Sequence, residues 1–185
     1  MKCRHCKDNL KLPLINLGSS PPSNAYLTKK RLSAPEKWFP LRVLVCQSCW
    51  LVQTEDFANA DELFNDEYSY LSSYSKSWLK HSENYLKHVI ERFSLNNNSY
   101  IIEIAANDGY LLQFAQNLNI PCLGIEPTRS AANLARKKGI EIVEEFFGFN
   151  LAKNLVKKGN QADLVIANNV LAHVPDINDF VKGVS

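Results

Sequence analysis

The stretch YIIEIAANDGYLL, residues 100–112, decides how the second half of this chain folds. It begins as a β-branched apolar run, passes into a turn of small residues and continues as a helical pattern. Ala105, Asn107 and Gly109 stand at the alternate positions that glycines hold in nucleotide-binding turns. Because Asn adopts positive φ more readily than most residues, Asn107 is a credible substitute for glycine. The stretch predicts a strand, a tight turn and a helix N-terminus whose free N–H groups face a nucleotide-type cofactor.

Strand and helix patterns alternate regularly from residue 99 onward. Strands are expected over residues 101–105, 122–125, 140–143 and 162–167, and helices over residues 110–118, 130–138 and 151–158. This alternation builds right-handed βαβ units and a parallel sheet with helices on both faces. Since such sheets bind ligands at the carboxyl ends of their strands, polar residues there are candidates for a site.

Two acidic residues lie at these strand ends. Glu126 comes before Pro127, about twenty positions beyond the first turn, where a carboxylate accepts hydrogen bonds from ribose hydroxyls. The alternative is a surface carboxylate at a helix N-terminus, which fits less well after a buried apolar strand. Glu103 lies within the first strand, and we expect it to organise the turn or to meet a cofactor ammonium group, because an unpartnered buried carboxylate is costly.

The third and fourth strands also deliver candidate site residues. Asn168 and Asn169 follow the fourth strand, and His173 comes soon after them. For His173 a general base, a hydrogen-bond donor to substrate and a structural histidine all remain open, and we favour a site role. Phe146 and Phe147 follow the third strand, where an adenine ring would lie, and they fit equally well as core residues.

Two C-x-x-C hooks, Cys3/Cys6 and Cys46/Cys49, lie in the first fifty residues. Each hook places two thiolates on one tight turn, and two hooks complete the tetrahedral S₄ site typical of structural zinc. A redox C-x-x-C normally occurs once, at the start of a helix, and four cysteines leave no open position for a catalytic zinc. We expect His5 to point outward. Short strands over residues 14–18, 41–45 and 51–53 make this a small β-rich module.

Residues 68–75, YSYLSSYS, carry an unusual density of hydroxyl groups. Two interpretations are open: a polar linker whose serines cap the next helix, or a segment that lies over a ligand pocket. Ser75 or a nearby serine begins a helix through Phe93, and a helical turn or two is expected over residues 59–64. His81 and His88 are two helical turns apart, too far to share a metal, and are expected to be exposed.

The composition is that of an ordinary globular protein, with 45% apolar and 22% charged residues. A formal net charge of +2 is too small to indicate a nucleic-acid partner. Lys137 and Lys138 precede Gly139, so a solvated helix end is the favoured interpretation of these cations. No apolar run approaches a membrane span and no signal peptide is recognised, so we expect a cytoplasmic protein. Five cysteines, four of them in hooks, fit a reduced, metal-binding chain.

Together these motifs carry a family resemblance over essentially all 185 residues. The chain resembles the SAM-dependent sugar C-methyltransferases that act on nucleotide-linked 3-keto-deoxysugars. The matching motifs are the two hooks, LG (17–18), PSN (22–24), CWLVQ (49–53), YSYLSS (68–73), EIAANDGYL (103–111), GIEP (124–127), FFG (146–148) and NNVLAHVPD (168–176). Their combination is more specific than any single motif.

The resemblance implies an α/β chain with a β-rich zinc-binding module in residues 1–56 and a connecting segment in residues 57–98. An incomplete class I methyltransferase (Rossmann-like) sheet follows in residues 99–185. The implied cofactors are SAM and structural Zn²⁺, and the implied partner is a nucleotide-sugar. The candidate SAM-binding residues are Glu103, Ala105, Asn107, Gly109, Tyr110, Glu126, Pro127, Phe146, Phe147, Asn168 and Asn169. The candidate catalytic residues are His173, Tyr68 and Tyr70.

The resemblance also implies a mechanism, in which a base removes the proton α to a ketone and the enolate attacks the SAM methyl group. His173 and the segment of Tyr68 and Tyr70 match part of the family's sugar-facing set. A further Tyr and His, including the base, belong to a C-terminal domain, whereas this chain stops at Ser185 before three more strands of the sheet. We interpret the sequence as a truncated product that binds SAM without completing catalysis alone. Its fourth strand would be an uncovered edge open to self-association.

Two other classes of function remain as alternatives. A zinc-stabilised α/β binding module without catalysis is motivated by the missing C-terminal domain. A dinucleotide-dependent enzyme fits less well, because the G-x-G-x-x-G spacing fails at Ala105 and Asn107.

Overall fold

The computed structural model describes residues 1–24, 26–55, 57, 63–64 and 70–185. The chain forms two compact units, one of Met1–Ser69 with Val174–Asn178 and one of Tyr70–His173 with Asp179–Ser185. Tyr68 and most of the helical turn predicted over residues 59–64 lie outside the described residues. In the part of the chain that is described, no helix combines the length and apolar character needed to span a membrane.

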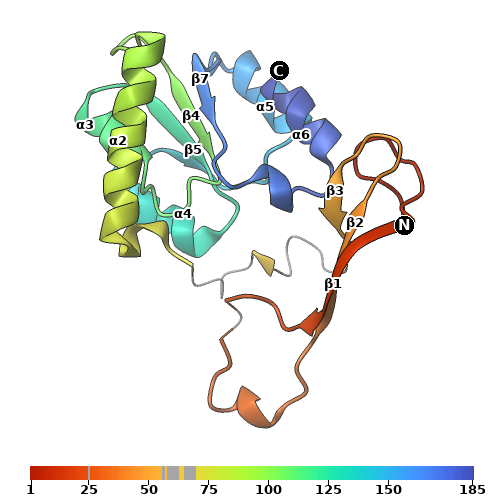
Figure 1. Cartoon of the computed structure of the whole chain (residues 1–185). Coiled ribbons are helices and arrows are strands. Elements are labelled where there is room, and N and C mark those ends of the chain that lie inside the picture. The colour runs from red at the N-terminus through yellow and green to blue at the C-terminus, as the bar shows by residue number, and fades with distance from the viewer. Residues whose placement is uncertain (25, 56, 58–62, 65–69) are drawn as a thin grey trace. The chain divides into compact units, whose positions relative to one another are not determined.

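The first unit is built on an antiparallel sheet with the order β1-β2-β3 (Figure 1). Its strands are β1 (Leu12–Ser20), β2 (Phe39–Val45) and β3 (Val52–Thr54), and the short 3₁₀ helix η1 (Arg31–Ser33) lies between β1 and β2. The three predicted strands are confirmed, with β1 longer than expected at both ends. The buried core of this unit consists of Cys3, Leu10, Leu44 and Cys46, so half of its members are thiols. So small a core depends on its cysteines for stability.

The second unit is a parallel sheet with the order β6-β5-β4-β7. The strands are β4 (Ile101–Ile104), β5 (Cys122–Ile125), β6 (Ile142–Val143) and β7 (Leu164–Ile166). Successive strands step outward from β4 to β6, and the chain then crosses back to place β7 on the other side of β4. The carboxyl end of β4 is therefore the topological switch point, where sheets of this kind bind ligands. β7 is an edge strand among the described residues, and self-association through it stays a prediction.

Helices cover both faces of this sheet, as the alternating pattern predicts (Figure 1). The helices are α2 (Lys76–Phe93), α3 (Leu112–Asn117), α4 (Arg129–Lys137), α5 (Phe149–Lys157) and α6 (Ile177–Val184), with 3₁₀ helices η2 (Ser72–Tyr74) and η3 (Leu171–His173). In Figure 1, α2 and α3 lie on one side of the sheet and α5 and α6 on the other. The predicted elements agree with these bounds to within about two residues. α3 begins two residues later than predicted because the turn after β4 continues to Leu111.

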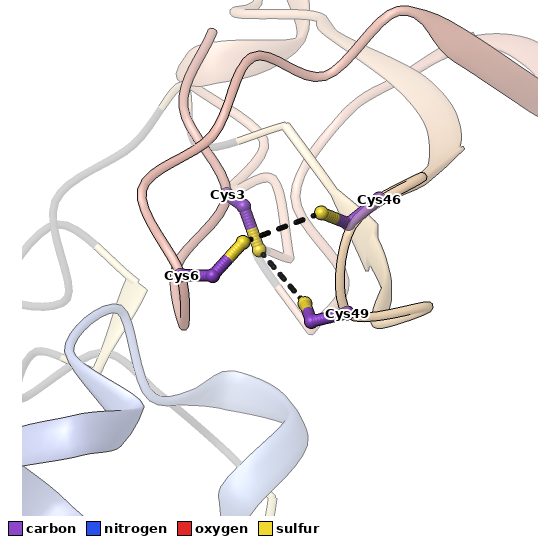
Figure 2. A group of neighbouring side chains, drawn as sticks. All are labelled: Cys3, Cys6, Cys46 and Cys49. Atoms are coloured by element: carbon purple, nitrogen blue, oxygen red, sulfur yellow. Dashed lines mark hydrogen bonds between the residues drawn. The ribbon is translucent and has the colours of Figure 1, made fainter.

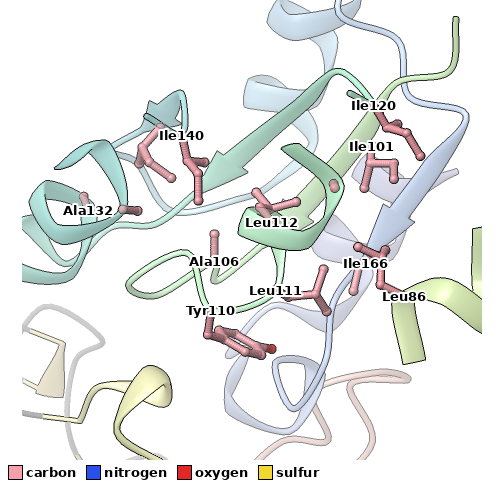
Figure 3. Packing of buried hydrophobic residues seen from close by; sticks show 13 residues of the cluster. Leu86, Ile101, Ala106, Tyr110, Leu111, Leu112, Ile120, Ala132, Ile140 and Ile166 are labelled. Atoms are coloured by element: carbon pink, nitrogen blue, oxygen red, sulfur yellow. The ribbon is translucent and has the colours of Figure 1, made fainter. Parts of the chain in front are cut away.

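The core packs α2, α3 and α4 against the sheet (Figure 3). All four residues of β4 are buried, which explains why its sequence is a continuous apolar run broken only by Glu103. Leu86 of α2 and Leu112 of α3 are fully buried in this cluster, beside Ile166 of β7. The carboxyl end of β4 is thus held on a rigid support.

α2 begins at the predicted N-cap. The Ser75 hydroxyl accepts a hydrogen bond from the Trp78 N–H at 3.2 Å, and Ser82, Leu86 and Val89 form the buried face. His81 and His88 are exposed, as predicted. Phe93 is 56% exposed. It is the last residue of the helix, and the next residue, Ser94, turns the chain away in a left-handed conformation.

Replacing Ser75 by Ala removes the acceptor for one N–H of the first turn of α2. We expect Ser75→Ala to lower the free energy of unfolding by about 1 kcal/mol. Urea denaturation followed by far-UV circular dichroism measures the change. Lys76→Ala, at the neighbouring exposed first position of the helix, is the matched control and should leave stability within about 0.5 kcal/mol of the parent. Equal stability of the two variants would contradict the capping role.

Candidate functional site

The turn after β4, residues 105–109 and called the β4 turn below, has three left-handed residues in alternation. Ala105 has a φ of 55°, Asn107 of 50° and Gly109 of 75°. The prediction that Asn107 replaces a glycine is confirmed, and Ala105 also adopts the conformation at a cost of about 1 kcal/mol. The sequence motif is degraded in residue type, whereas the backbone keeps the alternating geometry.

Gly109 is required by space as well as by φ. A Cβ at this position would collide with the Ile140 side chain and would lie 3.2 Å from the Ala135 Cβ. Gly124 on β5 is equally confined, because a Cβ there would lie 2.8 Å from the Ala106 Cβ. The β4 turn therefore packs against its neighbours with no room for side chains at these two positions.

The N–H groups of the β4 turn are less available to a ligand than the sequence predicts. The Asn107 N–H donates to Glu126 Oε2 at 2.9 Å, and the Gly109 N–H donates to the Ala106 carbonyl at 2.9 Å. The expectation of free N–H groups is wrong at both residues, because the protein itself bonds them.

Glu126 is held on both sides of its carboxylate. Oε2 accepts from Asn107 and Oε1 accepts from the Thr128 N–H at 2.7 Å, while the residue is only 5% exposed. Burial raises the pKa of Glu126, and the bonds from Thr128 and Asn107 partly oppose that rise. A carboxylate oxygen can accept two hydrogen bonds, so each oxygen of the fixed Glu126 carboxylate keeps capacity to accept one from a diol such as a ribose.

Glu103 is the most deeply buried acid in this region, at 1% exposed. Neither carboxylate oxygen has a well-formed hydrogen bond to any residue that the structure describes. Burial raises the pKa of Glu103 well above its usual range, the neighbouring Tyr110 hydroxyl lowers it, and the charges of Glu126 and Asp108 raise it further. A buried carboxylate with open acceptor sites is costly unless a cation joins it, and an amino-acid ammonium group fits that need.

Tyr110 connects Glu103 to the end of β7. Its ring stacks on Trp78 of α2 with centroids 6.1 Å apart, and its hydroxyl lies next to Glu103 and Asn168. Burial and the Glu103 charge raise the pKa of Tyr110, so the hydroxyl stays protonated and acts as a donor. The structure thus brings Glu103, Tyr110 and Asn168 together at the carboxyl ends of β4 and β7.

The hydroxyl-rich segment lies against the β4 turn through residues 70–73, which we call the strap. The Asn107 amide donates to the Tyr70 carbonyl at 3.1 Å, and its Oδ1 accepts from the Ser72 N–H at 2.9 Å. The capping interpretation is confirmed at Ser75, whereas a segment that lies over a ligand pocket stays a prediction, with the strap in contact with the β4 turn. Tyr70 is half exposed beside Asn107.

The remaining candidate residues lie at other strand ends and in η3. His173 is exposed in η3 and Asn169 is exposed with a φ of 56°, so their site roles stay predictions. Phe147 packs edge-on against Phe180 with centroids 5.2 Å apart, as its core interpretation expects, while Phe146 is 45% exposed. Pro127, between Glu126 and Thr128, is half buried and shapes the approach to the carboxylate.

The four predicted metal ligands come together in the first unit (Figure 2). The Sγ atoms of Cys3, Cys6, Cys46 and Cys49 all lie within 4.8 Å of one another. The Cys3–Cys49 pair is 3.6 Å apart and the Cys6–Cys46 pair 3.4 Å. His5 is exposed and is not a member of this cluster. A closed set of four sulfurs is the donor set of a structural zinc site.

The two hooks have the same backbone turn. The residue after each second cysteine, Lys7 or Trp50, has a φ of 63° and donates its N–H to the carbonyl of the first cysteine of the hook. Positive φ is unfavourable for residues with such large side chains. The strain persists because the turn is what aims both thiols of a hook at one point.

Gln53 of β3 supports the first hook, a role that no spacing rule indicates. Its amide donates to Cys3 Sγ at 3.3 Å and its Oε1 accepts from the Arg4 N–H at 2.9 Å, with 5% of the residue exposed. Burial alone would raise the pKa of Cys3, but the Gln53 amide and backbone N–H donors outweigh it and lower that pKa to about 6. Gln53 therefore orients one ligand and favours its thiolate.

Comparison with known families identifies both parts of the chain. A family described as "Methyltransferase domain" matches residues 78–184, which is more than half of the chain. The chain belongs to this methyltransferase family. A second family, described as "Putative zinc binding domain", matches residues 3–64 and includes all four clustered cysteines. The predicted fold, a class I methyltransferase-like parallel sheet preceded by a small β-rich module, is confirmed.

Individual relatives are more distant. The chain is 28% identical over 184 residues to the C-methyltransferase NovU of Streptomyces niveus, and the match covers 100% of this chain and 44% of NovU. The methyltransferase chain therefore spans less than half of that relative's length. Among solved structures, YcgJ of Bacillus subtilis is 15% identical with a TM-score of 0.43, covering 57% of this chain and 44% of YcgJ. A SAM-dependent methyltransferase of Archaeoglobus fulgidus is 14% identical with a TM-score of 0.34, covering 41% of this chain and 33% of that one.

Gly109 and Gly159 distinguish the two reasons for which a position requires glycine, a positive φ and a lack of space for a Cβ. Both have positive φ, but nothing lies within 4 Å of a Cβ at Gly159. We expect Gly159→Ala to lower the free energy of unfolding by about 1 kcal/mol. Gly109→Ala should cost roughly 1–3 kcal/mol more, because Ile140 and Ala135 must move. Urea denaturation of both variants measures the difference, and equal costs would show that the β4 turn is not tightly packed.

Proposed function

We propose that this chain is the zinc-module and cofactor-binding part of a SAM-dependent C-methyltransferase that acts on a nucleotide-linked keto-deoxysugar. The observation that carries the proposal is the pair of buried carboxylates at the switch point. Glu103 has no well-formed hydrogen bond among the described residues, and Glu126 is fixed across the β4 turn. The family match and the likeness to NovU support methyl transfer.

Each of the two buried carboxylates would bind a different part of SAM. Glu126, oriented by Asn107 and Thr128, would accept hydrogen bonds from the ribose hydroxyls. Glu103, which faces the Tyr110 hydroxyl, would bind the ammonium group of the methionine part. Asn168 stands next to the same hydroxyl and would hold it in place. Phe146 and Phe147 are the proposed wall for the adenine ring.

The proposed reaction forms a carbon–carbon bond at the position next to the sugar's keto group. SAM, when bound, supplies a methyl group on a positively charged sulfur. A base must first remove the proton α to the ketone, which leaves an enolate as the nucleophile. We assign sugar-facing roles to His173 and Tyr70, and to Tyr68, which lies outside the described residues. Tyr110 is suited to donate a hydrogen bond and not to serve as the base, because its pKa is raised.

We further propose that structural zinc holds the first unit together, bound by Cys3, Cys6, Cys46 and Cys49. The closed sulfur set leaves no position for substrate, so the metal would act in folding and not in the reaction. Four thiols of this kind need a reducing compartment, which supports a cytoplasmic location.

Binding of S-adenosylhomocysteine tests the cofactor assignment directly. We expect isothermal titration calorimetry to show one site per chain. Glu126→Ala should weaken binding at least tenfold, about 1.4 kcal/mol, because the ribose hydroxyls lose their acceptor. Glu141→Ala removes an exposed carboxylate and should bind like the parent. Glu126→Gln, which keeps one acceptor oxygen and the side-chain volume, should show an intermediate loss.

Two outcomes would count against the proposal. A folded parent protein that gives no heat of binding would favour the non-catalytic, zinc-stabilised binding module. Affinity for NAD without affinity for S-adenosylhomocysteine would favour a dinucleotide-dependent enzyme instead. Circular dichroism on each variant confirms that lost binding is not lost folding.

Metal retention tests the zinc assignment independently. We expect about one zinc per chain by elemental analysis, as the S₄ donor set requires. Gln53→Leu should keep that stoichiometry but release zinc to a chelator about tenfold faster, because Cys3 Sγ loses its donor. Gln47→Leu alters an exposed glutamine of the second hook and should release zinc at the parent rate. A content well below one zinc defeats the metal assignment, whereas equal release from both variants defeats only the role of Gln53.

A further inference from the structure

Lys138, the first residue after α4, contacts two segments that lie far from it in sequence. Its Nζ donates to the Asp108 carbonyl at 2.6 Å and to the Ser73 hydroxyl at 2.7 Å. Asp108 belongs to the β4 turn and Ser73 to the strap. The solvated helix-end cation that the sequence suggests is therefore not what the structure shows, and only 30% of the Lys138 side chain is exposed.

Asp108 explains why this ammonium group is held in place. The residue is 4% exposed, and its Oδ1 has no hydrogen bond to the described part of the chain. Its other oxygen, Oδ2, lies 3.5 Å from Lys138 Nζ. A buried carboxylate without a nearby cation is costly, so the pair fixes the lysine far more firmly than a surface contact would.

The strap has a second attachment next to the first. Asn107 bonds the Tyr70 carbonyl and the Ser72 N–H, and Lys138 bonds the adjacent Ser73. The Asn107 backbone in turn donates to Glu126. One connected set of bonds therefore runs from the strap through the β4 turn to the carboxylate at the end of β5.

We propose that Lys138 is a positioning residue that fastens the strap to the β4 turn, so that Tyr70 and the cofactor carboxylates keep a fixed mutual geometry. The inference extends the proposed function, since it assumes that the β4 turn binds SAM. Lys138 itself touches neither cofactor nor sugar in this assignment. Its ammonium group acts through Ser73 and Asp108.

Hydrogen exchange of the ligand-free protein tests the fastening without any cofactor. Lys138→Met keeps the length of the side chain and removes the charge. We expect the amides of residues 70–74, read by mass spectrometry on peptides, to exchange about tenfold faster in Lys138→Met than in the parent. Lys137→Met, one residue earlier and exposed, should exchange like the parent. Ser73→Ala leaves the pair of Lys138 with Asp108 intact and should also accelerate exchange in the strap.

The affinities for SAM and S-adenosylhomocysteine distinguish a positioning role of Lys138 from a direct electrostatic effect of its charge on the ligand. SAM carries a positive sulfur that S-adenosylhomocysteine lacks, so loss of a nearby cation by itself would favour SAM over its product. A positioning role predicts instead that Lys138→Met weakens both ligands by the same factor, about fivefold, with Lys137→Met unchanged. Unchanged strap exchange in both Lys138→Met and Ser73→Ala overturns the proposal, as does a shift in the ratio of the two affinities. If the parent binds neither ligand, the proposed function fails while the exchange result still decides the fastening.

Discussion

The hydrogen bond from the Asn107 N–H to the Glu126 carboxylate is the constraint around which the α/β unit is arranged. It joins the carboxyl ends of β4 and β5, the two strands that flank the β4 turn on this side of the sheet. The β4 turn that carries this N–H has an alternating left-handed backbone at Ala105, Asn107 and Gly109. Within the same turn Gly109 packs against Ile140, where a Cβ would collide with the isoleucine side chain. The turn therefore combines an electrostatic contact with a close packing arrangement.

The two units are stabilised by different interactions. The α/β unit buries a continuous apolar cluster from α2, α3, α4 and the sheet, and its polar site lies at one edge of that cluster. The β-rich unit has a buried core in which Cys3 and Cys46 are two of four members, and β1 is exposed along almost its whole length. With the structural zinc proposed above, metal binding and folding of this unit would be one process.

Hydrophobic periodicity and motif spacing in the sequence predict the local features of the structure. The alternation of strands and helices, the cap at Ser75, the substitution by Asn107 and the gathering of the cysteines all follow from short patterns in the sequence. Lys138 and Gln53 escaped prediction because their partners are set by tertiary structure. A lysine beside a helix-ending glycine looks solvated until Asp108 and Ser73 are brought to it. The Asn107 N–H was misjudged for the same reason, since Glu126 comes from another strand, whereas the Gly109 N–H is bonded within the turn to the Ala106 carbonyl.

Backbone strain marks both candidate sites. Ala105 in the β4 turn, and Lys7 and Trp50 in the hooks, all hold a left-handed conformation that their own side chains disfavour. In the hooks a hydrogen-bonded turn imposes the conformation and aims the thiols, and the residue after Ala105 donates its N–H to the Ile125 carbonyl of β5. Glycine would relieve the strain at all three positions without changing the turn. The strained residues are tolerated because tertiary contacts, and not local preference, determine the backbone there.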